Sequence, residues 1–241
     1  MPLSESEIVA RLKDNVARVR ERMAAAAARA GREPHEILLV GVTKYVNTDL
    51  MRLLVEETGV NHLGESRPQD LWRKVESLGG MQIAWHLIGH LQRNKVRRTL
   101  AACWGVVIHS VDSLRLLEEI NREASEIGRP ADVLLEVNIS GDANKHGFAP
   151  DEMTATLASI AAMQNVCVLG LMTMASLEGG ADQARRDFAA LRNLLDCLRP
   201  HCPEQIVLDQ LSMGMSGDYE IAIEEGATMV RVGSALFEGI V

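Results

Sequence analysis

A lysine at the end of an apolar run is the first residue of this sequence with distinctive chemistry. Lys44 follows residues 37–42, ILLVGV, which have the apolar composition of a buried strand. A lysine that becomes buried loses hydration, its pKa falls, and the neutral amine attacks carbonyl carbons. Strand alternation turns Tyr45 outward if Lys44 points inward. The alternative is a lysine that reaches solvent from the strand end, and this stretch alone favours that alternative.

Two segments near the C-terminus have the composition of phosphate-binding loops. The first, LSMGMSG, contains Ser212, Gly214 and Ser216, and its exposed backbone N–H groups can surround an anion. The second contains Gly233 and Ser234, which we expect to open a short last helix with an anion at its N-terminus. Each segment alone is also explained as a glycine turn with a serine cap, so only their joint position favours a phosphate site.

The histidines His86 and His90 have the spacing H-x-x-x-H. Their segment predicts a strand that runs into a glycine turn, without the helix and the glutamate of a zinc protease, so we predict no metal site. We expect His86 to line the interior of the fold and His90 to begin the next loop. The basic segment that follows is a solvated helix face or, through Arg93, Asn94 and Lys95, an anion site.

Composition excludes several classes of protein. The 241 residues, 47% of them hydrophobic, suffice for a substantial core, and a net charge of -8 argues against a general nucleic-acid binder. The polar N-terminus and the lack of an apolar run of about 18 residues predict no export and no membrane partner. We expect reduced thiols in a cytoplasmic protein, because no C-x-x-C pair occurs among Cys103, Cys167, Cys197 and Cys202.

Short apolar runs alternate with helix-period segments along the whole chain after residue 31. We count eight runs, at 37–42, 60–64, 83–89, 105–111, 132–140, 166–174, 205–213 and 228–233. Eight strand–helix repeats in about 200 to 250 residues are typical of a (β/α)8 TIM barrel, an α/β fold whose strands are buried on both faces.

An open doubly wound sheet is the competing architecture. It would normally carry G-x-G-x-x-G after its first strand, where this sequence has VTKYVNTD. No linker divides the chain, so we predict a single domain over 1–241. An extra N-terminal helix over 1–31 is predicted by the capping box from Ser4 to Glu7, and it would pack on the barrel.

The barrel brings the lysine and the two loops to one end of the fold. Strand ends face the mouth of such a barrel, and the loops after strands seven and eight form its recurrent phosphate site. Lys44 facing a phosphate site suggests a phosphorylated aldehyde held as a Schiff base, and pyridoxal 5'-phosphate (PLP) fits that description. A Schiff-base aldolase that uses Lys44 on a sugar phosphate without a cofactor remains an alternative.

Several blocks of this sequence also resemble a known family. They are VGVTK (40–44), LGESRPQDL (63–71), WHLIGHLQRNKVR (85–97), VNIS (137–140), KHGF (145–148), GLMTM (170–174) and LSMGMSGDYEIAIEEGATMVRVGSALFEG (211–239). Together they are similar to the pyridoxal phosphate homeostasis proteins, which have the barrel of the alanine racemase N-terminal domain.

The resemblance implies a fold-type-III PLP site with the cofactor as an aldimine on Lys44. It also implies phosphate contacts from the loop 212–216 and from Gly233 and Ser234, with Arg231 near the pyridine nitrogen. The residues expected at the cofactor are Lys44, Val42, Ser66, His86, Ser212, Met213, Gly214, Met215, Ser216, Arg231, Gly233 and Ser234.

The sequence departs from the family pattern at several positions. Ser66 stands where the family usually has asparagine, so a contact specific to asparagine is in doubt, and His90 stands where proline is usual. The second lysine often found near the cofactor lysine is absent from VTKYV. Ser234 replaces the commoner threonine and keeps the hydroxyl.

Arg231 bears on whether the protein is an enzyme. A guanidinium does not readily accept a pyridine proton, so a PLP ring beside it is a weak electron sink. An ion pair of Arg231 with Asp209 or Glu136 is the alternative. The resemblance to alanine racemase also implies that a racemase of this class needs a tyrosine from a partner subunit and a C-terminal β domain, and only 234–241 follow the last predicted strand.

We therefore expect a PLP-binding homeostasis protein without robust catalytic activity. It would exchange PLP with apo PLP enzymes, affect amino-acid and vitamin B6 balance, and be a monomer. A weak PLP-dependent amino-acid racemase is the alternative function.

Overall fold

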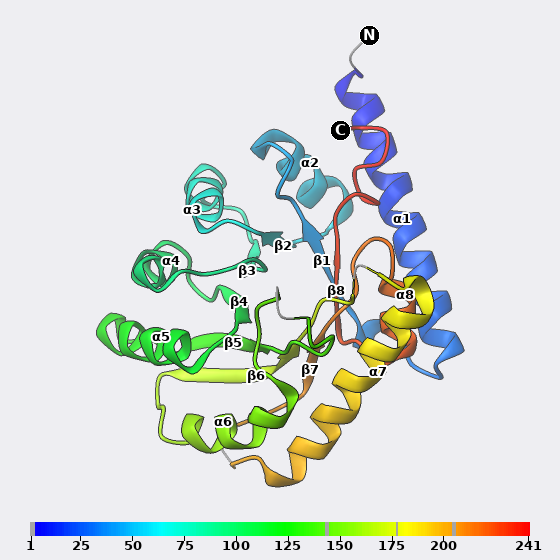
Figure 1. The fold of residues 1–241 in the computed structure, drawn as a ribbon. Helices are drawn as coiled ribbons and strands as arrows, with labels where there is room; N and C mark the ends of the chain where they lie inside the picture. The colour runs from blue at the N-terminus through cyan, green and yellow to red at the C-terminus, as the bar shows by residue number, and fades with distance from the viewer. Residues whose placement is uncertain (1–2, 143–144, 177, 204–205) are drawn as a thin grey trace.

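The computed structural model describes residues 3–142, 145–176, 178–203 and 206–241, and these form a closed parallel barrel (Figure 1). Its strands are hydrogen-bonded in chain order, and β8 closes onto β1 with Leu38 opposite Met229. The strands are β1 (Leu38–Val42), β2 (His62–Glu65), β3 (Ala84–Leu87), β4 (Val107–Val111), β5 (Ala131–Glu136), β6 (Val166–Met172), β7 (Gln210–Ser212) and β8 (Met229–Val232). The predicted TIM barrel is therefore confirmed, and the open sheet is excluded.

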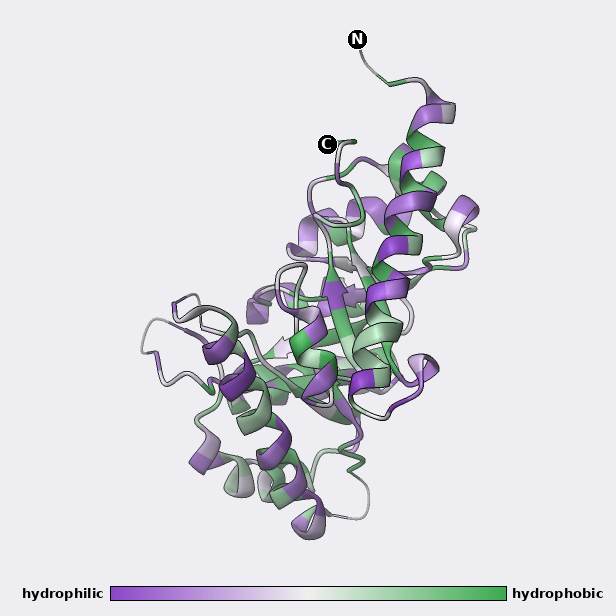
Figure 2. Cartoon of the chain, turned by 90° about the vertical axis from the view of Figure 1, so that its right-hand side faces the viewer, coloured by the Kyte–Doolittle hydropathy of each residue, from purple (hydrophilic) through white to green (hydrophobic). Residues whose placement is uncertain are grey.

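Helices alternate with the strands and cover the outside of the barrel. They are α1 (Glu5–Arg29), α2 (Thr48–Thr58), α3 (Pro68–Ser77), α4 (Val96–Ala102), α5 (Leu114–Ile127), α6 (Met153–Ile160), α7 (Gly180–Leu198) and α8 (Tyr219–Glu224). Short 3-10 turns lie at Pro34–Glu36, Arg93–Lys95, Pro150–Glu152 and Arg199–His201. Figure 2 shows mainly hydrophobic strands inside and helices that are hydrophilic on one face, which is the amphipathic pattern that buries one helix face.

The N-terminal helix packs against the segment that follows β8. The predicted capping box is confirmed, because the Ser4 side chain accepts from the Glu7 N–H and the Glu7 carboxylate accepts from the Ser4 N–H. Arg11 Nη1 donates to the carbonyl of Gly239 at 2.8 Å, and Asn15 Nδ2 donates to the carbonyl of Leu236 at 3.1 Å. The first helix therefore holds the chain that leaves the mouth of the barrel.

Two local predictions near the C-terminus are corrected. The segment after Gly233 forms successive turns, such as the one closed by the Leu236 N–H on the Gly233 carbonyl, rather than a short helix. Strand β7 is limited to Gln210–Ser212, so the apolar residues Ile206 and Leu208 are buried as part of the connecting segment and not as a strand. Apolar composition alone does not distinguish a buried connection from a strand.

No helix in the described part of the chain is long and apolar enough to cross a membrane.

Candidate functional site

A cavity of about 610 Å³ lies between the ends of β1 and β8 and the loop after β7. It brings Lys44 together with both predicted phosphate segments, although more than 160 residues separate them in the chain. The lining residues are Val42, Lys44, Tyr45, Val46, Met215, Ser216, Gly217, Arg231, Gly233, Ser234, Phe237 and Val241. Chain order and barrel closure produce this arrangement, because β1 and β8 are neighbours in the closed sheet.

Lys44 lies in the turn after β1 and not within the strand. The strand ends at Val42, and the Lys44 side chain is half-buried at the cavity wall, between the buried lysine and the solvent-reaching lysine that the sequence left open. Its Nζ lies 4.9 Å from the centroid of the Tyr45 ring. Tyr45 is 83% exposed, as the outward orientation predicts, yet it also contributes to the cavity wall. The amine is thus partly shielded and still accessible.

A buried network fixes the backbone that carries Lys44. The Nζ of Lys74 donates to the carbonyl of Thr43 at 2.8 Å and pairs with Glu65 Oε1 at 2.8 Å. The Thr43 hydroxyl donates to the same carboxylate oxygen, and all three residues are buried. Glu65 Oε2 has no hydrogen-bond partner among the described residues. Thr43, the residue directly before Lys44, is therefore fixed by hydrogen bonds to both its carbonyl and its side chain.

The loop after β7 has a conformation that needs glycine at one position. Gly214 has a φ of 89°, and a Cβ there would lie 2.5 Å from the Ala222 Cβ. Both the backbone conformation and the lack of space therefore exclude a larger residue. The Met215 N–H donates to Asp218 Oδ1 at 2.5 Å, which closes the loop onto the start of α8. This geometry presents Ser216 and its neighbours at the cavity.

Donors at the cavity suit an anion. The Ser216 Oγ accepts a hydrogen bond from the Gly233 N–H at 3.0 Å, so the two phosphate-type segments contact each other. The backbone N–H groups of Ser216, Gly217 and Ser234 have no hydrogen-bond partner within the described residues. Unpaired backbone N–H groups that converge on a cavity are the donors of phosphate sites.

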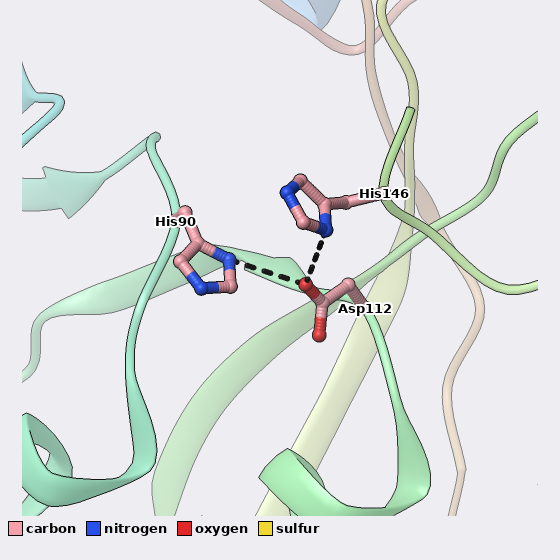
Figure 3. A group of neighbouring side chains, drawn as sticks. All are labelled: His90, Asp112 and His146. Carbon is pink, nitrogen blue, oxygen red and sulfur yellow. Dashed lines mark ion pairs between the residues drawn. The ribbon is translucent and has the colours of Figure 1, made fainter. Parts of the chain in front are cut away.

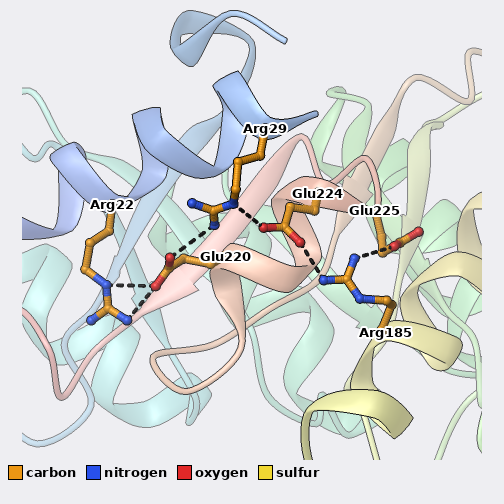
Figure 4. A network of polar contacts seen from close by, with 6 residues as sticks. All are labelled: Arg22, Arg29, Arg185, Glu220, Glu224 and Glu225. Carbon is orange, nitrogen blue, oxygen red and sulfur yellow. Dashed lines mark hydrogen bonds and ion pairs between the residues drawn. The ribbon is translucent and has the colours of Figure 1, made fainter. Parts of the chain in front are cut away.

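Ion pairs hold α8 in place behind this loop (Figure 4). Arg22 and Arg29 of α1 both contact Glu220, at 2.5 and 3.3 Å, and Arg29 reaches Glu224 at 2.6 Å. Arg185 of α7 contacts Glu224 at 2.5 Å. Ion pairs of exposed arginines contribute little to stability, so the network orients α1, α7 and α8 more than it stabilises them.

Arg231 is buried at the wall of the cavity. Its Nη1 donates to Ser212 Oγ at 2.5 Å and its Nη2 donates to the Thr173 carbonyl at 3.0 Å. Burial lowers the pKa of Arg231 to about 10, opposed by the charges of Glu136 and Asp218, so the guanidinium stays protonated at neutral pH. Within the described residues it makes no ion pair, which corrects the alternative of a pair with Asp209 or Glu136.

A chain of histidines continues from Ser212 through the barrel interior. His109 Nδ1 lies 2.9 Å from Ser212 Oγ, His109 Nε2 lies 2.8 Å from His86 Nδ1, and His86 Nε2 lies 3.0 Å from His62 Nδ1. Burial lowers the pKa of His86 to about 3 and that of His109 well below its usual range. The Arg231 guanidinium can only donate, so the Ser212 hydroxyl accepts from it and donates its own hydrogen to His109 Nδ1. His109 Nε2 then donates to His86 Nδ1, and His86 Nε2 donates to His62 Nδ1. In this assignment the rings are neutral and each carries its hydrogen on Nε2.

The cavity includes only some of the predicted site residues. Its lining contains Val42, Lys44, Met215, Ser216, Arg231, Gly233 and Ser234. The structure places five others outside that lining: Ser66, His86, Ser212, Met213 and Gly214.

Those five residues have other contacts. Ser212 and His86 belong to the histidine chain that begins at Arg231. The Met213 N–H donates to the Met229 carbonyl at 3.1 Å, and the Gly214 carbonyl accepts from the Arg231 N–H at 3.0 Å. The Ser66 backbone packs against Gly89, where a Cβ would lie 2.2 Å from the Ser66 carbonyl oxygen.

Sequence reasoning missed Glu65, Lys74, His62, His109 and Thr173. Glu65 gave a usable signal, because this charged residue directly follows the predicted run 60–64, and Lys74 lies nine positions later, in α3. No local pattern marks the others.

Comparison with known proteins places this chain in a family. Residues 9–240 match the alanine racemase N-terminal domain model. The chain is 38% identical over 224 residues to the pyridoxal phosphate homeostasis protein of Aquifex aeolicus, covering 93% of this chain and 96% of that protein. It is 34% identical over 232 residues to the protein of that name in Escherichia coli, covering 92% and 94%.

Solved structures of other proteins also resemble this chain. The PipY structure of Synechococcus elongatus with PLP bound has a TM-score of 0.78 at 34% identity, and covers 91% of this chain and 99% of its own. An alanine racemase of Clostridium difficile has a TM-score of 0.70 at 16% identity over 93% of this chain and 59% of its own, which shows the shared fold. The resemblance found in the sequence is confirmed, and the chain belongs to the pyridoxal phosphate homeostasis protein family.

Proposed function

We propose that this protein binds PLP through a Schiff base on Lys44 and serves PLP homeostasis. The observation that carries the proposal is a cavity that combines a partly shielded amine with backbone N–H donors from two loops that are unpaired within the described residues. The PLP-bound relative PipY supports the choice of ligand. In the reaction, the Lys44 amine attacks the aldehyde carbon and the carbonyl oxygen leaves as water, so the attachment reverses by hydrolysis.

The phosphate end is assigned to the loops after β7 and β8. Ser216 offers a hydroxyl, and the N–H groups of Ser216, Gly217 and Ser234 are free to donate. No lysine or arginine other than Lys44 and Arg231 lines the cavity in the described part of the chain. The phosphate is therefore held mainly by backbone dipoles, as in other anion sites of this kind.

The position and charge of Arg231 favour cofactor binding without catalytic turnover of substrates. Its protonated guanidinium has donors only, and Ser212 and Thr173 fix its position. PLP supplies an electron sink when it is bound, and this sink is strongest when the pyridine nitrogen carries a proton. A donor at that nitrogen keeps it unprotonated, so carbanion chemistry is disfavoured.

We further propose that the protein acts as a monomer in the cytoplasm and exchanges PLP with apo forms of PLP enzymes, thereby affecting amino-acid and vitamin B6 balance. Reversible imine chemistry at an accessible lysine supports exchange, because hydrolysis releases the cofactor unchanged.

An absorbance titration tests the proposal. PLP added to PLP-free protein should produce a band near about 420 nm, typical of a protonated PLP imine. Lys44→Ala should lack the band, whereas Lys13→Ala, an exposed lysine paired with Glu57 on the outside of α1 and α2, should keep it. A band of equal size in Lys44→Ala would refute the assignment.

A further inference from the structure

A second group of side chains meets at the barrel mouth, outside the cavity that contains Lys44. His90 follows β3, Asp112 follows β4, and His146 lies in the segment between β5 and α6 (Figure 3). These residues are up to 56 positions apart in sequence, and barrel closure brings them together. As the sequence predicts, His86 is buried in the interior, whereas His90 lies in the loop after β3 and is exposed at the rim.

The three side chains point their ligand atoms at a common point. The Nδ1 of His90 lies 3.2 Å from Asp112 Oδ2, and the Nδ1 of His146 lies 3.7 Å from the same oxygen. All three ligand atoms lie within 4.8 Å of one another. Zinc–ligand bonds of about 2.0 to 2.2 Å at tetrahedral angles separate ligand atoms by about 3.3 to 3.6 Å. Two of the three separations are already near that value, and the exposed histidines have room to adjust.

The carboxylate is oriented for this role. Asp112 has a side chain only 10% exposed, and the Ser113 hydroxyl donates to its Oδ1 at 3.1 Å. That contact leaves Oδ2 for the two histidines. Hydrogen bonds that orient ligating carboxylates are a regular feature of metal sites.

The contacts among these three side chains leave their hydrogen-bonding atoms poorly paired. The 3.7 Å separation between His146 and Asp112 is too long for a hydrogen bond. The two imidazole rings stack with centroids 4.8 Å apart and an interplanar angle of 22°, which keeps both Nδ1 atoms beside the same carboxylate oxygen. Two neutral imidazoles and one carboxylate are, in contrast, a common donor set for a divalent transition metal.

We propose that His90, Asp112 and His146 form a binding site for a divalent transition metal of the zinc class. The side chains of His90 and His146 are 48% and 67% exposed, so the ion enters from solvent and keeps positions open for water or an oxygen ligand. The proposal goes beyond PLP binding and does not depend on it, because none of the three residues lines the cavity of Lys44.

Metal titration of tag-free, PLP-free protein tests the site. Zn²⁺ in competition with a chromogenic chelator measures the affinity, and Co²⁺ reports the ligands through its visible spectrum. We expect one ion per chain in the wild type. Asp112→Asn, which keeps the shape of the side chain, and His146→Ala should each weaken binding by at least about tenfold.

Matched variants make the outcome decisive. His35→Ala and His201→Ala remove exposed histidines elsewhere and should bind Zn²⁺ as the wild type does. Lys44→Ala should also bind it normally, which separates this site from the PLP proposal. Circular dichroism confirms that each variant is folded. Wild-type affinity in Asp112→Asn, a thiolate–cobalt absorption band, or no binding by the folded wild type would each overturn the proposal.

Discussion

Ser216 Oγ accepts a hydrogen bond from the Gly233 N–H at 3.0 Å and so joins the loop after β7 to the end of β8. The same hydroxyl lies at the cavity wall, where it is placed to contact an anion. Two segments that are separate in the sequence therefore line one cavity together with Lys44.

Ser216→Ala should weaken PLP binding by about ten- to a hundredfold. The variant loses one hydrogen bond to a charged phosphate, worth about 1.5 to 3 kcal/mol. Because Lys44 is unchanged, the imine band should still form at saturating PLP. Absorbance titration gives the dissociation constant, and Ser159→Ala, on the exposed face of α6, serves as the control. An unchanged dissociation constant would remove Ser216 from the phosphate site.

The PLP-loaded protein should not exchange the α-proton of alanine. Burial lowers the pKa of Arg231 only to about 10, so it stays protonated and, in its proposed position beside the pyridine nitrogen, would support no proton there. NMR of L-alanine in deuterated water with wild type and with Lys44→Ala measures the exchange. Deuterium incorporation catalysed by the wild type well above that measured with Lys44→Ala would favour the racemase alternative.

Lys74→Met should destabilise the fold by about 3 to 5 kcal/mol, because it leaves the buried Glu65 carboxyl group without its partner. Urea denaturation measures the loss in the free energy of unfolding. The double variant Glu65→Gln, Lys74→Met removes both charges and should recover more than half of that loss. A double variant as unstable as the single one would show that the ion pair is not the cause.

Stability should fall as the pH is lowered from 7 to 5, and the histidine chain should contribute. Burial lowers the folded-state pKa of His86 to about 3 and that of His109 further below its usual range. Below about 6.5 the unfolded chain binds protons that the folded chain does not, so stability declines by about 1.4 kcal/mol per pH unit for each such histidine.

The slope of this decline is the informative quantity. In His109→Gln one of these protons is lost from the unfolded state, so urea unfolding at several pH values should give a decline that is shallower by about one proton. Above pH 7 the histidines should contribute no pH dependence. An identical slope in wild type and variant would mean that His109 is protonated in the folded protein.

The barrel and the location of Lys44 at its mouth are predictable from the sequence for physical reasons. Strands buried on both faces leave apolar runs, and a parallel barrel puts every strand end and the following loop at one mouth. This places Lys44, Ser216 and Gly233 on one face without knowledge of any contact. The turn that carries Lys44 past the end of β1 is not encoded in that pattern, and neither are the turns after Gly233.

The hydrogen bonds between residues of different strands that support Arg231 are not predictable in the same way. His109 and Ser212 are 103 positions apart, and their hydrogen bond depends on which residues of β4 and β7 face the interior at the same height. A shift of one residue in either strand would turn the side chain outward. The group of His90, Asp112 and His146 has the same origin, since three separate loops bring it together.

Borohydride reduction followed by peptide mapping tests the central claim most directly. Reduction converts a PLP imine into a stable secondary amine, and mass spectrometry of a proteolytic digest then locates the labelled lysine. The account predicts a label on the peptide that contains Lys44 in nearly all molecules, and no label at that position without PLP. A label on another lysine, such as Lys145 or Lys95, or one spread over several surface lysines, would contradict it.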